Sequence, residues 1–222
     1  MSVLEQALLL ARRLPWPGAW AWLELAAAVA AGALFFWRCR GKRELRRAFV
    51  YSLPLAAIGA ALLGSALRLL GAGPAHDAFG LSSYGALVGM ASGFLLLSRR
   101  SPLSSSDRLL LLSPALLLLA ALGRLGCFAA GCEPGAVTAA PWGTRFPRGT
   151  STFRQHVSEG WVLPSDAWSL AVHPVQLYEA ALVLGLLVLV LALERRARPQ
   201  LTVASLVVGY AATRFAVSLY RV

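Results

Sequence analysis

Long apolar runs separated by short polar or basic stretches make up most of the chain. A helix needs about 20 mostly apolar residues to cross about 30 Å of hydrocarbon. Six segments meet this requirement, some marginally, and we expect each to be a transmembrane helix: residues 16–37, 49–70, 79–97, 109–127, 174–193 and 201–220. The pattern therefore predicts an all-α polytopic membrane protein, with about six transmembrane helices in a single membrane domain over residues 1–222.

Two parts of the chain, residues 1–15 and 133–173, are not predicted to cross the membrane. In residues 1–15 the basic pair Arg12 and Arg13 follows a short apolar stretch, which is the reverse of a secretory signal. We therefore expect an interfacial segment there, followed by helices one to four over residues 16–132 and helices five and six over 174–222. Residues 133–173 are too polar to span a membrane and long for a plain loop. They are predicted to form an extended extracytoplasmic (periplasmic) connection with some structure of its own.

Composition and charge agree with a membrane location. Hydrophobic residues make up 58% of the chain and charged residues 14%, and the net charge is +11. A basic balance can indicate nucleic-acid binding, but twelve of the 21 basic residues lie in three short connections between predicted helices. Short basic loops face the cytoplasm. The positive net charge therefore reflects the orientation of the helices in the membrane, and no nucleic-acid partner is expected. The sequence predicts a multi-pass protein of the cell inner membrane with both termini outside.

A few charged residues remain that topology does not explain. Arg124, Glu179 and Arg214 fall within predicted helices, and Arg221 falls just past one. An ionisable group at membrane depth costs several kcal/mol unless it is paired or hydrated, so it indicates function by default. The alternatives are a structural Arg–Glu pair and, for Arg221, snorkelling at a helix end. Because guanidinium donors match phosphate oxygens two at a time, the pattern favours recognition of an anionic lipid headgroup on the periplasmic side.

Three sequence patches contain these charges. The first runs Gly123-Arg124-Leu125-Gly126-Cys127-Phe128, where the two glycines would let a ligand approach the backbone. In the second, residues 173–179 (His-Pro-Val-Gln-Leu-Tyr-Glu), the proline suits the first turn of a helix. The third joins Tyr210 to Arg214 and Phe215 and continues to Arg221. Separately, Gly-x-x-x-Gly spacing at Gly85, Gly89 and Gly93 favours close helix packing, although glycine is also simply common in membrane helices.

Together, in this order, the three patches resemble the prolipoprotein diacylglyceryl transferase family over about three-quarters of the chain. The resemblance implies transfer of the diacylglyceryl group of phosphatidylglycerol to a cysteine thiol of an exported prolipoprotein. The products are a thioether and glycerol phosphate. The implied partners are phosphatidylglycerol, membrane lipid and the cysteine-bearing exported protein, and no cofactor or metal is implied.

The resemblance also implies residue roles. Arg124 and Arg214 would be catalytic and hold the phosphate, and Tyr84 would stand at the catalytic position of helix three. The remaining implied residues would bind or surround phosphatidylglycerol: Gly85, Gly123, Gly126, Cys127, His173, Gln176, Tyr178, Glu179, Tyr210 and Arg221. Glu179 would also act as a counter-ion and help to order the arginines.

The chain departs from the family pattern at several places. Tyr84 stands where the family has a histidine thought to help deprotonate the thiol, and a tyrosine with a pKa of about 10 is a poor base. Either Tyr84 only hydrogen-bonds, or the cationic cavity itself favours the thiolate. Typical members continue into a seventh helix, whereas this sequence ends at Val222. These departures leave open a paralogue with another cysteine-tagged client, or a membrane protein that binds or transports an anionic lipid without catalysis.

Cys127 and Cys132 stand where the family has Asn and Glu. Five residues along a helix is awkward spacing for a disulfide. The histidines show no ligand-like spacing that would complete a metal site. Packing is the favoured interpretation, while a disulfide, a metal pair or a nucleophile stay as alternatives.

Overall fold

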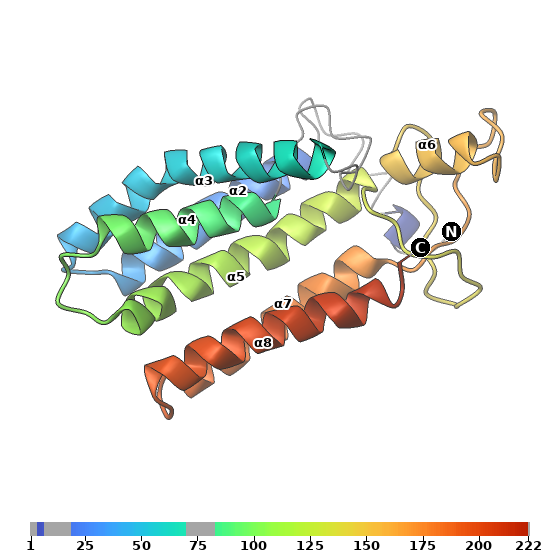
Figure 1. Cartoon of the computed structure of the whole chain (residues 1–222). Helices are drawn as coiled ribbons and strands as arrows, with labels where there is room; N and C mark the ends of the chain where they lie inside the picture. Colours follow the sequence, from blue (N-terminus) through green and yellow to red (C-terminus); the bar gives the residue numbers. More distant parts are fainter. Residues whose placement is uncertain (1–3, 7–18, 70–82, 222) are drawn as a thin grey trace. The chain divides into compact units, whose positions relative to one another are not determined.

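The computed structural model describes residues 4–6, 19–69 and 83–221 (Figure 1). This part of the chain is helical apart from its connections. The helices are α2 (Ala19–Arg38), α3 (Arg43–Leu69), α4 (Ser83–Leu97), α5 (Ser105–Ala130), α6 (Ser151–Ser158), α7 (Val175–Leu193) and α8 (Pro199–Ser218). Of the expected interfacial segment over residues 1–15, only residues 4–6 are described, and they are helical.

Each of the six predicted apolar segments coincides with a helix. Five helices, α2, α3, α5, α7 and α8, are long and apolar enough to cross a membrane, with mean hydropathies between 1.4 and 2.2. In α4 the apolar stretch Gly85–Leu97 is shorter than a full span. The prediction of an all-α polytopic membrane protein is confirmed. The predicted starts at residues 16 and 79 lie outside the described residues.

The chain forms two compact units, and each is described by itself. One consists of Gly32–Leu116 with Ala197–Val203, and the other of Met1–Ala31, Leu117–Arg196 and Ala204–Val222. Glycine packing between α3 and α4 holds the first of these. A Cβ on Gly85 would collide with the Gly59 carbonyl oxygen, and a Cβ on Gly89 with the Leu55 carbonyl oxygen. The expected close packing at Gly85 and Gly89 is therefore confirmed, with α3 as the partner helix.

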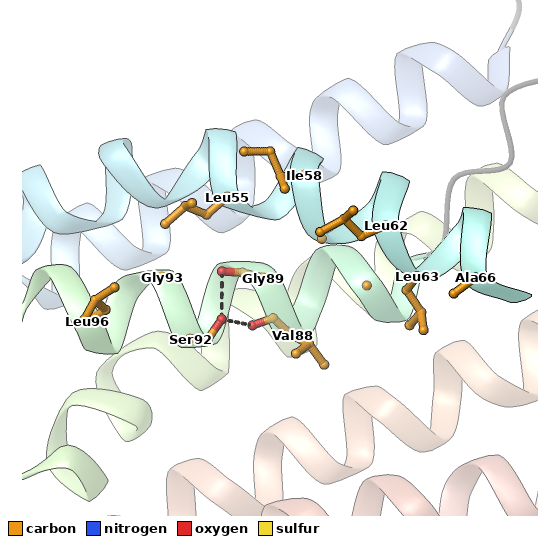
Figure 2. Close-up of a pocket in the computed structure, with 12 residues that line it drawn as sticks. Leu55, Ile58, Leu62, Leu63, Ala66, Val88, Gly89, Ser92, Gly93 and Leu96 are labelled. Carbon is orange, nitrogen blue, oxygen red and sulfur yellow. Dashed lines mark hydrogen bonds between the residues drawn. The ribbon is translucent and has the colours of Figure 1, made fainter.

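Beside this contact, α3 and α4 enclose an apolar groove of about 740 Å³ (Figure 2). Leu62 and Val88 on its walls are exposed. Ser92, its one hydroxyl-bearing residue, uses that hydroxyl to bond the carbonyl oxygens of Val88 and Gly89 within α4. The groove therefore presents an apolar surface, as suits a wall in contact with hydrocarbon.

Arg108, near the start of α5, joins α5 to the end of α4. Its guanidinium donates to the carbonyl oxygen of Leu95 at 2.9 Å and to the hydroxyl oxygens of Ser98 at 3.1 Å and Ser105 at 2.9 Å. The last carbonyl groups of a helix have no partner inside the helix. Arg108 is one of the twelve basic residues that the sequence pattern placed in connections between helices. It is buried and also makes a structural contact.

In the second unit, the connection over residues 131–174 forms a small head. It contains α6, which Thr150 caps by accepting a hydrogen bond from the Phe153 N–H. Isolated antiparallel bridges link Val137 and Thr144 to Val172. Phe146 and Val172 are fully buried and pack against Phe128 at the end of α5. The prediction that residues 133–173 carry structure of their own is confirmed.

Backbone hydrogen bonds of this head tie together the ends of three helices. The Ala136 N–H donates to the Tyr220 carbonyl oxygen beyond α8 at 2.8 Å, and the His173 N–H before α7 donates to the Ala136 carbonyl oxygen at 3.0 Å. Near the end of α5, Thr152 donates to the Gly131 carbonyl oxygen from its N–H and its hydroxyl. The head thereby fixes where the side chains at these three helix ends meet.

Candidate functional site

A buried carboxylate, Glu179 in the second turn of α7, is surrounded by three arginines. The Arg124 Nε lies 3.0 Å from Glu179 Oε1, and the Arg214 Nη1 lies 2.6 Å from both carboxylate oxygens. The Arg221 Nη2 lies 3.2 Å from Oε2. Glu179 is 1% exposed, and hydrogen bonds between charged groups are stronger where water is excluded. The sequence placed these charges at membrane depth, and the fold pairs Glu179 with both Arg124 and Arg214, as the alternative of a structural Arg–Glu pair expected.

A second carboxylate, Glu133, joins the same arginines from the loop after α5. Its Oε2 lies 2.8 Å from the Arg124 Nη1 and 3.1 Å from the Arg221 Nη2. Glu133 has φ of +49°, in the left-handed region that non-glycine residues adopt uncommonly. Burial alone would raise the pKa of Glu133, but the charges of Arg124 and Arg221 outweigh it and lower the pKa below the ordinary 4.5.

Glu133 is a contact that sequence reasoning missed. The resemblance drew attention to Cys132, which stands where the family has a glutamate, whereas the carboxylate that meets the arginines is one residue further along the chain. The available signal was an acidic residue five positions after the glycine–arginine patch. The left-handed backbone at Glu133 accompanies this shift by one residue.

Gln176 holds this loop in place from α7. It lies one turn before Glu179, is fully buried, and donates through Nε2 to the carbonyl oxygens of Cys132 and Glu133. The arrangement explains the spacing of the second patch, because residues three apart on a helix share a face. One turn of α7 thus supports the loop, and the next supplies the central carboxylate.

The cluster carries an excess of positive charge. Arg124, Arg214 and Arg221 supply three positive charges and Glu133 and Glu179 two negative ones, which leaves one net positive charge. The Arg221 Nε is buried and has no hydrogen-bond partner among the described residues. An unsatisfied buried donor on a cation is costly, so this cluster is suited to accept an additional anionic oxygen.

Aromatic residues adjoin the cluster. The rings of His173, Tyr178 and Tyr220 lie with centroids 5.2–6.1 Å apart. The Trp142 Nε1 donates to the Tyr178 hydroxyl oxygen at 2.7 Å, and that oxygen lies 3.2 Å from the His173 Nδ1. Because Tyr220 directly precedes Arg221, this packing fixes the end of the chain segment that carries the third arginine.

The structure places two further predicted residues, Tyr210 and Gly123, whose roles in phosphatidylglycerol binding stay predictions. Tyr210 lies on α8, one turn before Arg214, and is half-buried. Gly123 has nothing within 4 Å of where a Cβ would be, so its side faces open space.

Gly126 faces α2. A Cβ there would lie 3.1 Å from the Glu24 Cγ and 3.2 Å from the Trp20 carbonyl oxygen. Glu24 is a single acidic residue inside an apolar run, which sequence reasoning did not single out.

The two cysteines lie close together without a bond between them. Cys127 and Cys132 form no disulfide, and the Cys132 Sγ lies 3.3 Å from the Cys127 carbonyl oxygen. A hydrogen bond with Cys127, and then burial, raise the pKa of the Cys132 thiol. Within the described ranges, no three His, Cys, Asp or Glu side chains gather so as to hold a metal ion.

The remaining predicted residues lie in the other unit. Gly85 belongs to α4, where it packs on Gly59 of α3. Tyr84 also belongs to α4, but its side chain lies outside the described residues. Their roles in phosphatidylglycerol binding and catalysis stay predictions.

The fold and this cluster define a class of protein: a multi-pass α-helical membrane protein with a buried site made of arginines and carboxylates. Residues 18–222 match the sequence profile of the family described as prolipoprotein diacylglyceryl transferase, and the chain belongs to that family. The family membership implied by the three sequence patches is thereby confirmed.

Two curated relatives carry the name phosphatidylglycerol–prolipoprotein diacylglyceryl transferase. The protein of Treponema denticola is 31% identical over 156 residues, which are 64% of this chain and 46% of the relative. The protein of Geobacter sulfurreducens is 33% identical over 144 residues, or 64% of this chain and 48% of the relative. The matched regions thus span about half the length of these relatives.

Proposed function

We propose that this protein transfers the diacylglyceryl group of phosphatidylglycerol to the cysteine thiol of an exported prolipoprotein. The observation that carries the proposal is the convergence of Arg124, Arg214 and Arg221 on the buried Glu179, with one positive charge in excess. The family membership and the names of the two relatives supply the reaction.

In the proposed reaction the thiolate sulfur attacks the glyceryl carbon that carries the phosphate ester. A C–S bond forms, the C–O bond to phosphate breaks, and glycerol phosphate leaves with the bonding electrons. Arg124 and Arg214 hold the phosphate and stabilise the charge that develops on it. Preorganised cations aimed at a developing charge are among the largest contributions to catalysis.

Glu179 has a supporting role in this mechanism. Three guanidiniums at this spacing would repel one another, and the buried carboxylate holds them in one geometry before substrate binds. Such preorganisation avoids reorganisation during the reaction. Arg221 and Tyr210 support the same site, and Gly123 leaves room beside Arg124.

We further propose that the site faces the periplasm. The basic connections between α2 and α3, α4 and α5, and α7 and α8 would then lie in the cytoplasm, as the positive-inside rule requires. Both ends of this chain would lie outside. This orientation would give the site access to exported clients.

The test is a reconstituted transfer assay. The protein in phosphatidylglycerol-containing vesicles, incubated with a peptide carrying a lipobox cysteine, should yield a peptide heavier by one diacylglyceryl group in mass spectrometry. The matched control is the same peptide with serine in place of cysteine, which should stay unchanged. No mass increase under conditions where a relative named as this transferase is active would contradict the proposal. Transfer to other cysteine peptides in preference to a lipobox would indicate a paralogue with a different client.

A further inference from the structure

The arginine cluster consists of Arg124, Arg214 and Arg221 with the carboxylates Glu133 and Glu179, and the two carboxylates differ in exposure. The Glu179 side chain is almost fully buried, whereas half of the Glu133 side chain is exposed. The three arginine side chains are partly exposed as well, between 13% and 23%. Glu133 therefore lies on the accessible side of the cluster, and a phosphate that reaches the arginines comes close to its carboxylate.

Glu133 is held at this place by its backbone and by its side chain. Its carbonyl oxygen accepts from the Gln176 Nε2 at 3.3 Å, and its Oε2 accepts from the Arg124 Nη1 at 2.8 Å. The same Oε2 lies 3.1 Å from the Arg221 Nη2. Burial opposes ionisation, but the charges of Arg124 and Arg221 outweigh it and keep the pKa of Glu133 below the ordinary 4.5. A negative charge is therefore present here when a ligand arrives at pH 5 or above.

The charged and titratable groups around Glu133 come from four parts of the fold. They are Arg124 and Cys127 of α5, Cys132 of the same loop, Glu179 of α7, Arg214 of α8 and Arg221 just past α8. Three arginines and two carboxylates leave one positive charge, which a singly charged phosphate balances. A doubly charged phosphate would leave one negative charge unpaired, and an unpaired charge out of water is costly.

The proposed reaction converts one of these charge states into the other. Phosphatidylglycerol is a phosphodiester with one negative charge. When its C–O bond breaks, the bonding electrons stay on the phosphate oxygen, and glycerol phosphate leaves as a phosphomonoester with a second negative charge. Three arginines balanced by Glu179 alone would carry two positive charges and would hold this product tightly. Glu133 removes one of those two charges.

We propose that Glu133 determines which phosphate the site retains: it lets the arginines bind the singly charged phosphodiester and makes them release the doubly charged product. This inference rests on the proposed function. The repulsion between Glu133 and a phosphate is proportional to the charge of the phosphate, so it opposes binding of the product twice as strongly as binding of the substrate. Glu133 acts through this charge on the phosphate site and takes no part in bond making.

The experiment compares Glu133→Gln with the wild type by isothermal titration calorimetry in detergent at pH 7.5. The probes are glycerol phosphate and its methyl ester, which share the glycerol and the phosphate but carry about two and about one negative charges. Because the glutamine keeps the size and removes the charge, Kd should fall about tenfold for the methyl ester and about a hundredfold for glycerol phosphate. The ratio of the two Kd values should therefore shift about tenfold in favour of glycerol phosphate.

Three controls separate charge from shape. At pH 5 both probes carry mostly one charge, so Glu133→Gln should change both Kd values by the same factor. Glu133→Asp keeps the charge and suits left-handed backbone, and its ratio of Kd values should stay within about threefold of the wild type. Glu159→Gln removes a carboxylate of the same unit that accepts from Gln155 in the head, and it should leave both Kd values unchanged.

The reconstituted transfer assay gives the kinetic counterpart. Glu133→Gln should slow after its early turnovers as glycerol phosphate accumulates, because the product stays on the arginines. The inhibition constant of added glycerol phosphate should lie about a hundredfold below that of the wild type. Glu133→Asp should show the wild-type inhibition constant within about threefold.

Three results would overturn the assignment. One is an equal change in Kd for both probes at pH 7.5 in Glu133→Gln. Another is a Glu133→Asp variant that loses the discrimination as fully as Glu133→Gln does. The third is the absence of binding of both probes to the wild type and to Glu133→Gln. An inactive wild type in the transfer assay would instead contradict the proposed function, while calorimetry still measures the discrimination, so the two failures are distinguishable.

Discussion

Helix α5 carries one arginine near each end, and the two have opposite surroundings. Arg108 is 7% exposed and donates to neutral oxygens of Leu95, Ser98 and Ser105. Arg124 donates a hydrogen bond to Glu133 and forms an ion pair with Glu179, and both carboxylates are shared with other arginines. Both are guanidiniums on one apolar helix. What separates them is the kind of acceptor that each meets.

The difference has a physical consequence. Backbone carbonyls and serine hydroxyls at a helix end satisfy a guanidinium without neutralising it, and they do not titrate, so the contact of Arg108 is fixed and structural. Carboxylates shared among three arginines leave a positive charge that an incoming phosphate can take up. Arginine in a membrane protein is therefore diagnostic of function only once its acceptors are known.

The largest expected effect is on catalysis at the carboxylate-bound arginines. Arg124→Ala or Arg214→Ala should lower the transfer rate about a thousandfold, because the leaving phosphate loses a cation placed for it. Initial rates in the reconstituted assay measure this. Arg108→Ala serves as the matched control on the same helix and should keep its rate per folded molecule within about threefold. A near-normal rate in either site variant would remove that residue from the proposed site.

The next effect is on stability, and it should be found at Arg108. Arg108→Ala leaves the Leu95 carbonyl and two serine hydroxyls without their donor. Loss of hydrogen bonds to a charged group should lower the free energy of unfolding by about 1.5–3 kcal/mol. Unfolding in mild detergent, followed by circular dichroism, tests this. An unchanged stability together with lost transfer would reverse the comparison between the two arginines.

The smallest effect is a pH dependence confined to the carboxylate cluster. The pKa of Glu133 is lowered below 4.5 in the folded protein, so its contribution to stability is complete above pH 4.5 and is lost as the pH falls through the folded value. Glu133→Gln should therefore flatten the acid limb of a thermal-unfolding series between pH 3 and 6. Because the acceptors of Arg108 do not titrate, Arg108→Ala should keep the wild-type slope, and an equal flattening in both variants would contradict this account.

Much of the fold was predictable because it depends on local composition. A run of about 20 apolar residues has few alternatives to a spanning helix, so all six segments were placed from the pattern alone. The glycine spacing of α4 predicted close packing, but the partner helix α3 and its Gly59 were not predictable from α4 itself. The bounds of α3 and α5 differ more: these helices begin at Arg43 and Ser105, because polar and charged residues continue each helix beyond its apolar part.

The candidate site was predictable in part. Arg124, Glu179 and Arg214 stand out because each is a charge within an apolar run. Glu133 lies in a polar loop where an acidic residue is ordinary, and only its left-handed backbone and its contact with Arg124 distinguish it. Glu24 satisfied the same criterion as Glu179 but lies outside the three patches that carried the family resemblance.

The sequence by itself determined that this protein lies in a membrane, which helices cross that membrane, and which charged residues within them need an explanation. These properties follow from hydropathy and helix length, which are sums over neighbouring residues. The tertiary structure decided which oxygen each arginine meets: neutral groups for Arg108, two shared carboxylates for Arg124. Charge pairing acts over a few ångströms between residues as far apart as positions 124 and 221, so it depends on the fold that brings those helix ends together.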